Sequence, residues 1–307
     1  MNKERKQFMK TCKPVLRVLA VLLAFACIAT AADAPKLTFK FSNANVPRAL
    51  QTFPGSINNA GVTVGQYQDK KGVLHGYILK GKSLTTLDDP NGTKTNAQGI
   101  KFNSANKVVG WYTNSSGSQV GFLYDANTKE FTDILGPEGA TNSGAEGIND
   151  QGWIVGYYTD SSNHFHGFLL KGKKYHSLDV PGATASFAWG INNKGNIVLS
   201  WYDSTYPFKG SLYNYKKKTY IPIKGVPGAG PDGSEPFSIN NGGDILFTWY
   251  DSSGLEHGAL LHGGKYYKFG YPKAYQTNAA GINDKNALGG SYQGKINGPW
   301  SGFEATY

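Results

Sequence analysis

The sequence predicts an all-β fold, a six-bladed β-propeller of four-stranded blades that is closed by the N-terminal strand joining the last blade. Three observations predict it. A twelve-residue motif returns six times, the composition is rich in glycine and aromatic residues, and the strand missing from the last repeat is present near the N-terminus.

The motif is clearest at 147–158, where it reads Gly-Ile-Asn-Asp-Gln-Gly-Trp-Ile-Val-Gly-Tyr-Tyr. Its isoleucine is matched at Ile57, Ile100, Ile148, Ile191, Ile239 and Ile282, with spacings of 43, 48, 43, 48 and 43 residues. A period of this length is typical of propeller blades, each of which is built from four strands.

The composition favours the same class. Glycine accounts for 40 of 307 residues and charged residues for 17%, against usual shares of about 7% and about 25%. Glycine at turns, with aromatic and β-branched residues between them, indicates short strands joined by tight hairpins.

The third repeat shows the four strands that we expect in every blade, at 145–149, 153–158, 166–170 and 175–180. Pro181 ends the fourth strand, because proline has no N–H to donate to a ladder. Prolines at this place are Pro47, Pro90, Pro137, Pro181, Pro227 and Pro272, and tyrosines that close the second strand are Tyr67, Tyr112, Tyr158, Tyr202, Tyr250 and Tyr292.

The two ends of the chain complete each other. The last repeat has strand patterns at 281–283, 288–292 and 301–307 but ends before a fourth. The segment 37–41 resembles a fourth strand and is followed by Val46-Pro47. We therefore expect 37–41 to pair with 301–307, which would close the ring and leave no free edge.

A second period joins the repeats in pairs. His75, His166 and His257 lie 91 residues apart, each before glycine at the start of a third strand. Strands lie about 4.8 Å apart, so these imidazoles are too distant to share zinc, which needs nitrogen at about 2.1 Å. We expect structural histidines, with Asp88 and Asp179 as partners, and no metal or cofactor site.

The pattern Gly-Ile-Asn-x-x-Gly, Val-Gly-x-Tyr and His-Gly-Phe-Leu resembles the bacterial extracellular repeats of the HAF type. The His-Ala-Phe signature itself is replaced, as at His166-Gly167-Phe168. The resemblance covers nearly all of 37–307. It implies export and a repeat fold, and it brings no catalytic residues.

Residues 1–31 have the basic start, apolar centre and small-residue end of a secretory signal peptide. The single propeller domain is expected at 32–307. Removal of the leader leaves 25 basic and 20 acidic residues, a net charge of +5, and removes both Cys12 and Cys27. We expect a secreted or periplasmic monomer without a transmembrane segment, and no nucleic-acid partner.

Two sets of variable positions are candidate ligand contacts. Entry residues of the first strand point toward the central channel: Gln98, Glu146, Trp189, Phe237 and Ala280. Residues before the closing tyrosine of the second strand include Trp111, Tyr157, Trp201 and Trp249. Aromatic residues here could stack on sugars or peptides, and the simpler interpretation is channel filling for the first set and packing between blades for the second.

Other features are assigned to the framework. Asp160, Asp203 and Asp251 each open a turn, where aspartate bonds its own backbone. Lysines in the turns between third and fourth strands predict one basic rim, a solvated surface that anionic envelope polymers or lipid headgroups would match. No Gly-x-Ser-x-Gly, phosphate-loop or His-Glu-x-x-His motif is present.

Three functions remain open from the sequence. The leading hypothesis is a secreted non-catalytic binding or scaffold module for a glycan, peptide or cell-envelope component, with its ligand over the channel mouth. The second is a glycan-active lyase or hydrolase that uses Glu146 or another channel carboxylate. The third is a purely structural envelope protein.

Overall fold

A computed structural model describes residues 37–96 and 101–307. Every regular element in these ranges is a strand, and none of the described segments is an apolar helix long enough to cross a membrane. The predicted signal peptide, Gln98 and Ile100 lie outside the described residues. The 24 strands form six antiparallel sheets of four strands, which confirms the predicted fold class.

The first three blades follow the chain in order. Blade 1 contains β2 (Gln51–Ile57), β3 (Val62–Gln68), β4 (Leu74–Lys80) and β5 (Ser83–Leu87). Blade 2 contains β6 (Gly92–Asn96), β7 (Lys107–Asn114), β8 (Gln119–Asp125) and β9 (Glu130–Ile134). Blade 3 contains β10 (Asn142–Ile148), β11 (Ile154–Thr159), β12 (Phe165–Lys171) and β13 (Lys174–Ser177).

Two further blades repeat this order, and the sixth differs. Blade 4 contains β14 (Ala185–Ile191), β15 (Asn196–Tyr202), β16 (Lys209–Asn214) and β17 (Thr219–Ile223). Blade 5 contains β18 (Ser234–Ile239), β19 (Ile245–Tyr250), β20 (Glu256–His262) and β21 (Lys265–Phe269). Blade 6 contains β22 (Gln276–Ile282), β23 (Ala287–Gln293) and β24 (Trp300–Thr306), and its fourth strand is β1 (Lys40–Asn43).

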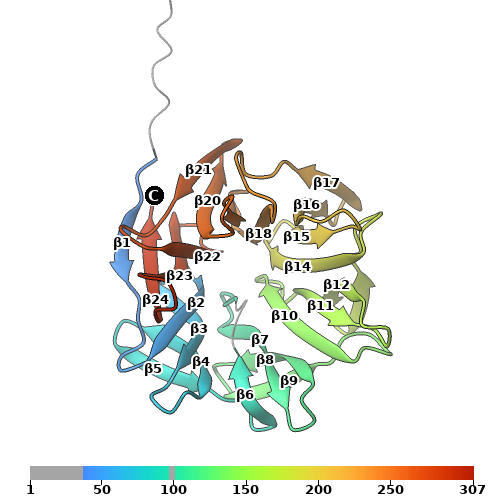
Figure 1. Cartoon of the computed structure of the whole chain (residues 1–307). Helices are drawn as coiled ribbons and strands as arrows, with labels where there is room; N and C mark the ends of the chain where they lie inside the picture. The colour runs from blue at the N-terminus through green and yellow to red at the C-terminus, as the bar shows by residue number, and fades with distance from the viewer. Residues whose placement is uncertain (1–36, 97–100) are drawn as a thin grey trace, which may run out of the picture. The chain divides into compact units, whose positions relative to one another are not determined.

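The predicted closure is confirmed. β1 pairs antiparallel with β24, with Phe41 opposite Ala305 and Asn43 opposite Phe303, and the two strands lie side by side in Figure 1. Phe41 also packs edge-on against Phe303, with ring centroids 5.5 Å apart. Because β1 covers the outer edge of blade 6, the two ends of the described domain are held in one sheet.

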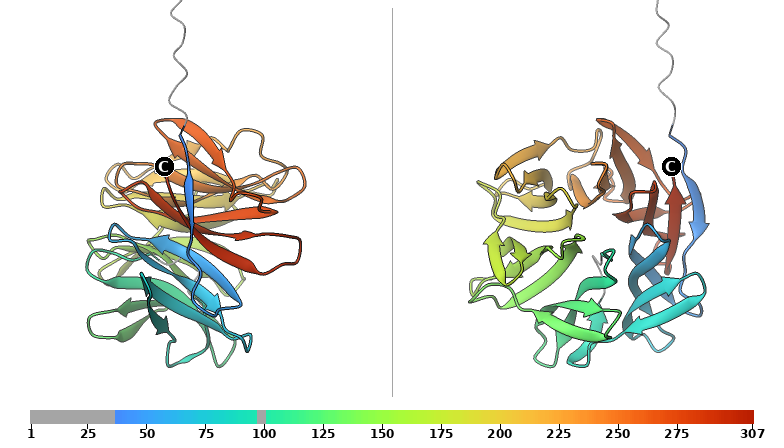
Figure 2. Two further views of the ribbon diagram at one scale, coloured as in Figure 1. Left: turned by 90° about the vertical axis from the view of Figure 1, so that its left-hand side faces the viewer. Right: turned by 180° about the vertical axis from the view of Figure 1, so that it is seen from behind.

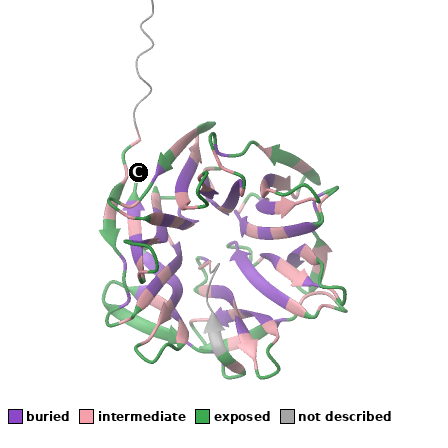
Figure 3. Cartoon of the chain, viewed as in Figure 1, coloured by how far each residue is buried: buried purple, intermediate pink, exposed green. Residues whose placement is uncertain are grey.

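Burial follows distance from the ring axis. The first strand of each blade lies innermost, and the turned views of Figure 2 show the six sheets arranged around this axis. The first two strands of a blade are mostly buried, as in β2 and β3, and third strands such as β4 are partly buried. Outer strands such as β1 and β5 are mostly exposed (Figure 3). A sheet packed on both faces needs apolar residues on both, so the hydrophobic core is divided among the interfaces between blades.

One such interface shows how the core is built. Between blades 3 and 4, Val155 and Leu169 pack against Ile197 and Leu199, and all four side chains are fully buried. Similar clusters join blade 1 to 2, 2 to 3, 4 to 5 and 5 to 6. Since burying a large aliphatic side chain contributes about 1.5–3 kcal/mol, these interfaces are the main source of stability.

The structure corrects the alignment of the second repeat. Phe102, and not Ile100, takes the place of the motif isoleucine, because Phe102 pairs with Val108 as Ile148 pairs with Ile154. The asparagine that follows is Asn103. The isoleucine pattern was misleading because the second repeat has an aromatic residue, Phe102, in place of the isoleucine.

The structure also corrects the second strands of blades 4 and 5. Trp201 pairs with Ser186 and Trp249 pairs with Ser234, in the register by which Tyr158 pairs with Ser143. The two tryptophans therefore replace the closing tyrosine in blades 4 and 5. The expectation that this tyrosine is the same in all six repeats was wrong. The sequence alignment slipped by one residue because a further tyrosine follows each tryptophan.

Candidate functional site

The Ile-Asn motif builds an asparagine ring at one end of the channel. Each turn between the first and second strands holds one ring asparagine: Asn58, Asn103, Asn149, Asn192, Asn240 and Asn283. Asn149 is typical, because its Oδ1 accepts the backbone N–H groups of Gln151 and Trp153 while its Nδ2 donates to the carbonyl of Asn192 in the next blade. The same hydrogen bond, from the Nδ2 of one ring asparagine to the backbone carbonyl of the next, joins Asn103 to Asn149, Asn192 to Asn240, Asn240 to Asn283 and Asn283 to Asn58.

The next residue of each turn adds a second layer of links. The backbone N–H of Asp150 donates to Asn193 Oδ1, and that of Asn193 donates to Asn241 Oδ1. In the next two turns, the backbone N–H of Asn241 donates to Asp284 Oδ1, and that of Asp284 donates to Asn59 Oδ1. This end of the channel, a hollow of about 320 Å³, is lined by groups whose hydrogen bonds hold blades together. We therefore assign it to the framework, and we call it the asparagine face.

The predicted basic rim surrounds the asparagine face, because the turns between third and fourth strands lie at this end of each blade. Its lysines are exposed: Lys80, Lys82, Lys129, Lys171, Lys173, Lys174, Lys216, Lys217, Lys218 and Lys265.

A β-bulge in the innermost strand directs one extra residue of a blade toward the channel. The bulge lies between Ala145 and Gly147 in β10, and Glu146 is the extra residue. Equivalent bulges place Gly55, Trp189, Phe237 and Ala280 in the same way. Bulges are common beside functional sites, since they re-aim a side chain without ending the strand.

Glycine in the second strand makes room for the bulge. A Cβ at Gly156 of β11 would lie 1.9 Å from the carbonyl oxygen of Gly144, a distance that no real contact shows. The Val-Gly pair of the repeat motif is thus explained by a close approach of two backbones.

The channel end opposite the asparagine face contains a cavity of about 270 Å³, which we call the aromatic cavity. Four of its lining residues are aromatic: Phe53, Trp189, Phe237 and Trp300. The others are Pro54, Gly55, Gln66, Glu256, Asn278, Ala280 and Ser291. A concave apolar site with a few polar groups is the usual form of a small-molecule site.

The four rings come from two sides of the channel. Trp189 and Phe237 are bulge residues of blades 4 and 5, with centroids 5.1 Å apart. Phe53 of blade 1 and Trp300 of blade 6 lie 6.1 Å apart. The bulge positions of blades 1 and 6 are Gly55 and Ala280, so the large rings of one side face small residues, which leaves the space open.

The ring of Trp189 is fixed by a polar network. Its Nε1 donates to Ser200 Oγ over 2.6 Å, and this hydroxyl donates to Glu235 Oε2 over 3.1 Å. Tyr250 donates its hydroxyl to Glu235 Oε1. Trp189 also stacks on Phe187, with centroids 5.8 Å apart and planes 13° from parallel. A fixed ring loses little entropy when a ligand stacks on it.

Two carboxyl groups lie at this end of the channel. Burial raises the pKa of Glu235 to about 7, opposed by hydrogen bonds from Ser200 and Tyr250 and assisted by the charge of Glu256. Burial also raises the pKa of Glu256, opposed by the hydrogen bond from Asn278. Glu256 lines the aromatic cavity, whereas Glu235 lies behind its wall.

Gln66 supplies a polar group without a partner. Its side chain is 7% exposed, it lines the aromatic cavity, and its Oε1 is buried without a hydrogen bond in the described part of the chain. An unpaired buried amide costs about 1–3 kcal/mol, so a ligand hydroxyl or N–H group would be stabilised here.

Only some of the predicted site residues lie in the aromatic cavity. Trp189, Phe237 and Ala280 line the aromatic cavity as expected. Tyr157 lies behind Trp189, with centroids 6.0 Å apart, and its hydroxyl accepts a hydrogen bond from Gln119. Trp111 is half-buried opposite Gly121 of β8 and lies outside the cavity lining.

Trp201 and Trp249 are not cavity residues. Trp201 donates to Ser211 Oγ, and Lys209 lies 5.1 Å above its ring. Trp249 donates to the carbonyl of Gly258 and stacks on His257 at 4.8 Å. Both lie away from the axis because they occupy the closing-tyrosine position, whose side chain faces the neighbouring strand.

Glu146 does point inward, but it is 1% exposed and contributes to neither hollow of the channel. Burial raises its pKa, and the charge of Lys101 opposes that shift. Lys101 also donates to Ser238 Oγ across the channel. Glu146 therefore lies buried inside the channel and not at its mouth.

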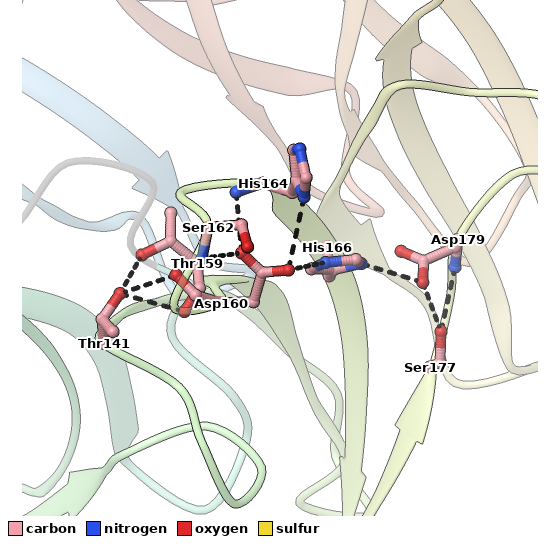
Figure 4. A network of polar contacts seen from close by, with 8 residues as sticks. All are labelled: Thr141, Thr159, Asp160, Ser162, His164, His166, Ser177 and Asp179. Carbon is pink, nitrogen blue, oxygen red and sulfur yellow. Dashed lines mark hydrogen bonds and ion pairs between the residues drawn. The ribbon is translucent and has the colours of Figure 1, made fainter.

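The histidines have the structural role that the sequence predicted. His166 lies between two carboxylates, with Nδ1 3.1 Å from Asp179 and Nε2 3.4 Å from Asp160 (Figure 4). Its ring stacks on Tyr158 at 5.0 Å. Asp160 also accepts the backbone N–H groups of Ser162 and His164. His75 repeats the arrangement with Asp69 and Asp88, whereas His257 contacts only Asp251 among the described carboxylates.

No group of three or more His, Cys, Asp or Glu residues is placed to hold a metal ion within the described ranges.

Sequence reasoning missed Phe53, Glu256, Asn278 and Trp300 of the aromatic cavity. Phe53 and Asn278 lie five residues before a ring asparagine, where other blades have Gly144, Phe187 and Glu235. That position varies as much as the bulge position does, and comparison of correctly aligned repeats would have identified it. Glu256 and Trp300 begin third strands and carry no such signal.

No protein-family model matches the sequence, and no similar curated protein was found. Solved structures similar in fold include the SapL1 lectin in complex with α-methyl fucoside, with a TM-score of 0.53, 12% identity, and coverage of 83% of this chain and 93% of that one. AofleA from Arthrobotrys oligospora has a TM-score of 0.54 and 12% identity over 86% of this chain and 88% of that one. A protein of unknown function from Dyadobacter fermentans has a TM-score of 0.55 and 12% identity over 87% and 98%. At this identity the likeness is one of fold, and the chain is a β-propeller of six four-stranded blades.

Proposed function

We propose that this chain is a secreted, non-catalytic glycan-binding β-propeller whose ligand lies in the aromatic cavity. The observation that carries the proposal is the combination of four aromatic rings with the polar side chains of Gln66, Glu256 and Asn278 in one cavity of about 270 Å³. The pyranose ring of a sugar has apolar C–H faces and polar edges, and this cavity offers partners for both.

A fold-level comparison supports the proposal. The SapL1 lectin was solved with α-methyl fucoside and has a similar fold. A propeller of this kind is thus compatible with sugar binding, and the residues of the aromatic cavity supply the local chemistry in this chain.

Binding is tested on a glycan array, followed by titration calorimetry with the strongest ligand and with α-methyl fucoside. Trp300→Ala removes one ring of the cavity, and we expect at least about a tenfold loss of affinity, since a stacked ring contributes about 0.5–1.5 kcal/mol beyond its buried area. Trp153→Ala is the matched control, because Trp153 is also half-buried but packs on Tyr215 at the asparagine-face end of blades 3 and 4. Binding that Trp153→Ala weakens and Trp300→Ala leaves intact would contradict this location.

A glycan hydrolase is the second candidate, favoured by two neighbouring carboxyl groups whose pKa values are both raised. A carboxyl with a pKa near 7 can serve as a general acid at neutral pH. The predicted residue Glu146 is excluded from the cavity lining, so this alternative depends on Glu256 with Glu235. Release of reducing ends from array-positive oligosaccharides, abolished in Glu256→Gln and retained in Glu146→Gln, would establish it.

Export is part of the proposal and is supported by the leader-like segment 1–31 and by the resemblance to HAF-type repeats. Mass spectrometry of the protein recovered from culture medium or periplasm should find Ala32 as the first residue. Recovery only from the cytoplasm, with residues 1–31 intact, would contradict export. Gel filtration of the same material should give one 32–307 chain per particle.

A further inference from the structure

The polar wall of the aromatic cavity is acidic. Glu256 is half-buried and lines the cavity, and its Oε2 accepts a hydrogen bond of 3.0 Å from Asn278 Nδ2. Its Oε1 has no hydrogen-bond partner in the described part of the chain. None of the described residues that line the cavity carries a positive charge. Glu256 therefore has one acceptor oxygen and its negative charge available to a ligand.

A second carboxyl group, Glu235, adds to this negative potential when it is ionised, above its pKa of about 7. Glu235 is 5% exposed, and both of its oxygens are occupied, by Ser200 Oγ and Tyr250 OH. It is close enough to Glu256 for their charges to oppose each other. A cation bound beside Glu256 would relieve this repulsion, since it interacts favourably with both groups.

The aromatic rings add to the same preference. The faces of tryptophan and phenylalanine attract cations within about 6 Å of the ring centre, and tryptophan does so best. The chain already uses this interaction elsewhere, because the Lys268 ammonium lies 4.1 Å from the Trp249 ring and Lys171 lies 4.2 Å from Trp153. In the aromatic cavity, two tryptophans and two phenylalanines surround a space that contains no protein cation.

We infer that the ligand of the aromatic cavity is an amino sugar whose protonated amine lies against Glu256 and between the aromatic rings. The inference rests on the proposed glycan-binding function and names its ligand class. A neutral sugar contacts the rings and Gln66 but leaves the charge of the Glu256 carboxylate without a partner of opposite sign. An N-acetylated sugar has the same deficiency, because its amide carries no charge.

Three disaccharides with one linkage separate these ligands: cellobiose, di-N-acetylchitobiose and the β-1,4 dimer of glucosamine. Calorimetric titration at pH 6.5 should show the glucosamine dimer binding about tenfold or more tightly than either neutral dimer, since a hydrogen bond to a charged group contributes about 1.5–3 kcal/mol. That preference should decrease as salt rises from 20 to 500 mM, because salt screens the charge term. The lower salt concentration screens the charges weakly, and the higher one screens them strongly.

Glu256→Gln keeps the shape of the side chain and removes its charge. We expect it to abolish the preference for the glucosamine dimer over cellobiose. The control is Glu138→Gln, an exposed carboxylate in the loop between β9 and β10 at the same end of the ring, which should change neither affinity. Tryptophan fluorescence of each variant verifies that the cavity has folded.

The outcomes separate the two proposals. Equal affinities for the three dimers in the wild-type protein, all lost in Trp300→Ala, would overturn the amino-sugar inference and leave the glycan-binding function standing. A preference for the glucosamine dimer that persists in Glu256→Gln would also overturn it. Failure of every dimer and of every array glycan to bind would overturn both.

Discussion

Asn149 donates its side-chain Nδ2–H to the backbone carbonyl of Asn192 in the next blade, over 3.3 Å. The same asparagine caps its own turn through Oδ1. One side chain thus shapes a hairpin and ties two blades together. Its recurrence around the ring explains why Ile-Asn is the most regular part of the repeat.

Asn149→Ala should lower the free energy of unfolding by about 2–3 kcal/mol, since it removes three buried or half-buried hydrogen bonds of about 1 kcal/mol each. Denaturant unfolding followed by tryptophan fluorescence measures the change. Gln151→Ala is the control in the same turn, because Gln151 is exposed, and it should cost less than about 0.5 kcal/mol. Equal effects of the two substitutions on the free energy of unfolding would contradict the framework role that we assign to the ring asparagine.

Ring closure by β1 depends on an aromatic contact. Phe41 packs against Phe303, Phe269 and Tyr271, with ring centroids 5.5, 6.3 and 5.4 Å away. Phe41→Ala should destabilise the domain by about 2–4 kcal/mol, at the lower part of the usual range because the side chain is only half-buried. Differential scanning calorimetry should show a clear fall in Tm. The substitution Lys40→Ala, at an exposed neighbour, should leave Tm nearly unchanged. A comparable fall in Tm there would indicate that stability depends on the pairing of β1 and not on the aromatic side chain of Phe41.

Asp160 links stability to acid pH. The backbone N–H of His164 is the largest of several hydrogen bonds that lower the pKa of Asp160 to about 2. A carboxyl whose folded pKa is below its unfolded value stabilises the native state above the unfolded pKa, near 4, and loses that contribution as pH falls toward 2. Thermal unfolding between pH 5 and 2 should therefore show a smaller acid-dependent loss in Asp160→Asn than in the wild type.

The asparagine variant is expected to fold, because blade 2 uses Asn114 at the same place. Asn114 Oδ1 accepts the backbone N–H groups of Ser116 and Ser118, as Asp160 accepts those of Ser162 and His164. An unchanged acid slope in the variant would show that Asp160 is not the titrating group.

Glu235 should have the opposite effect. Its pKa is raised by burial from 4.5 to about 7, so the unfolded chain releases the proton first and stability falls as pH rises from about 4.5 to about 7. Glu235→Gln should remove up to about 3 kcal/mol of this penalty at pH 7.5 and little at pH 4. Chemical unfolding at both pH values measures the difference. A variant that is destabilised equally at both would mean that Glu235 contributes through its hydrogen bonds alone.

The sequence alone determined the architecture. The five returns of Ile-Asn, the glycine-rich turns and the apolar second and third strands specify local pairing, which needs only neighbouring residues. Closure was also determined, because the last repeat lacks a fourth strand and 37–41 matches one. A missing edge partner at one end and a spare strand at the other leave one arrangement that covers the edge.

The alignment of repeats was determined only in part. Ile100 and the tyrosines after Trp201 and Trp249 matched the motif by residue type but not by register. Register is set by the fixed distance from the ring asparagine to the second strand, and that distance becomes evident only when the backbone hydrogen bonds are known.

The site required the tertiary structure. The sequence identified Trp189 and Phe237, because a bulge position recurs at one place in each blade. It had no means of placing Phe53 of the first blade beside Trp300 of the last, since these residues are 247 positions apart and meet only when the ring closes. It also placed Glu146 at the mouth and overlooked Glu256. Which carboxylate reaches the cavity depends on the volumes of the side chains that share the channel, and that volume balance is a property of the whole ring.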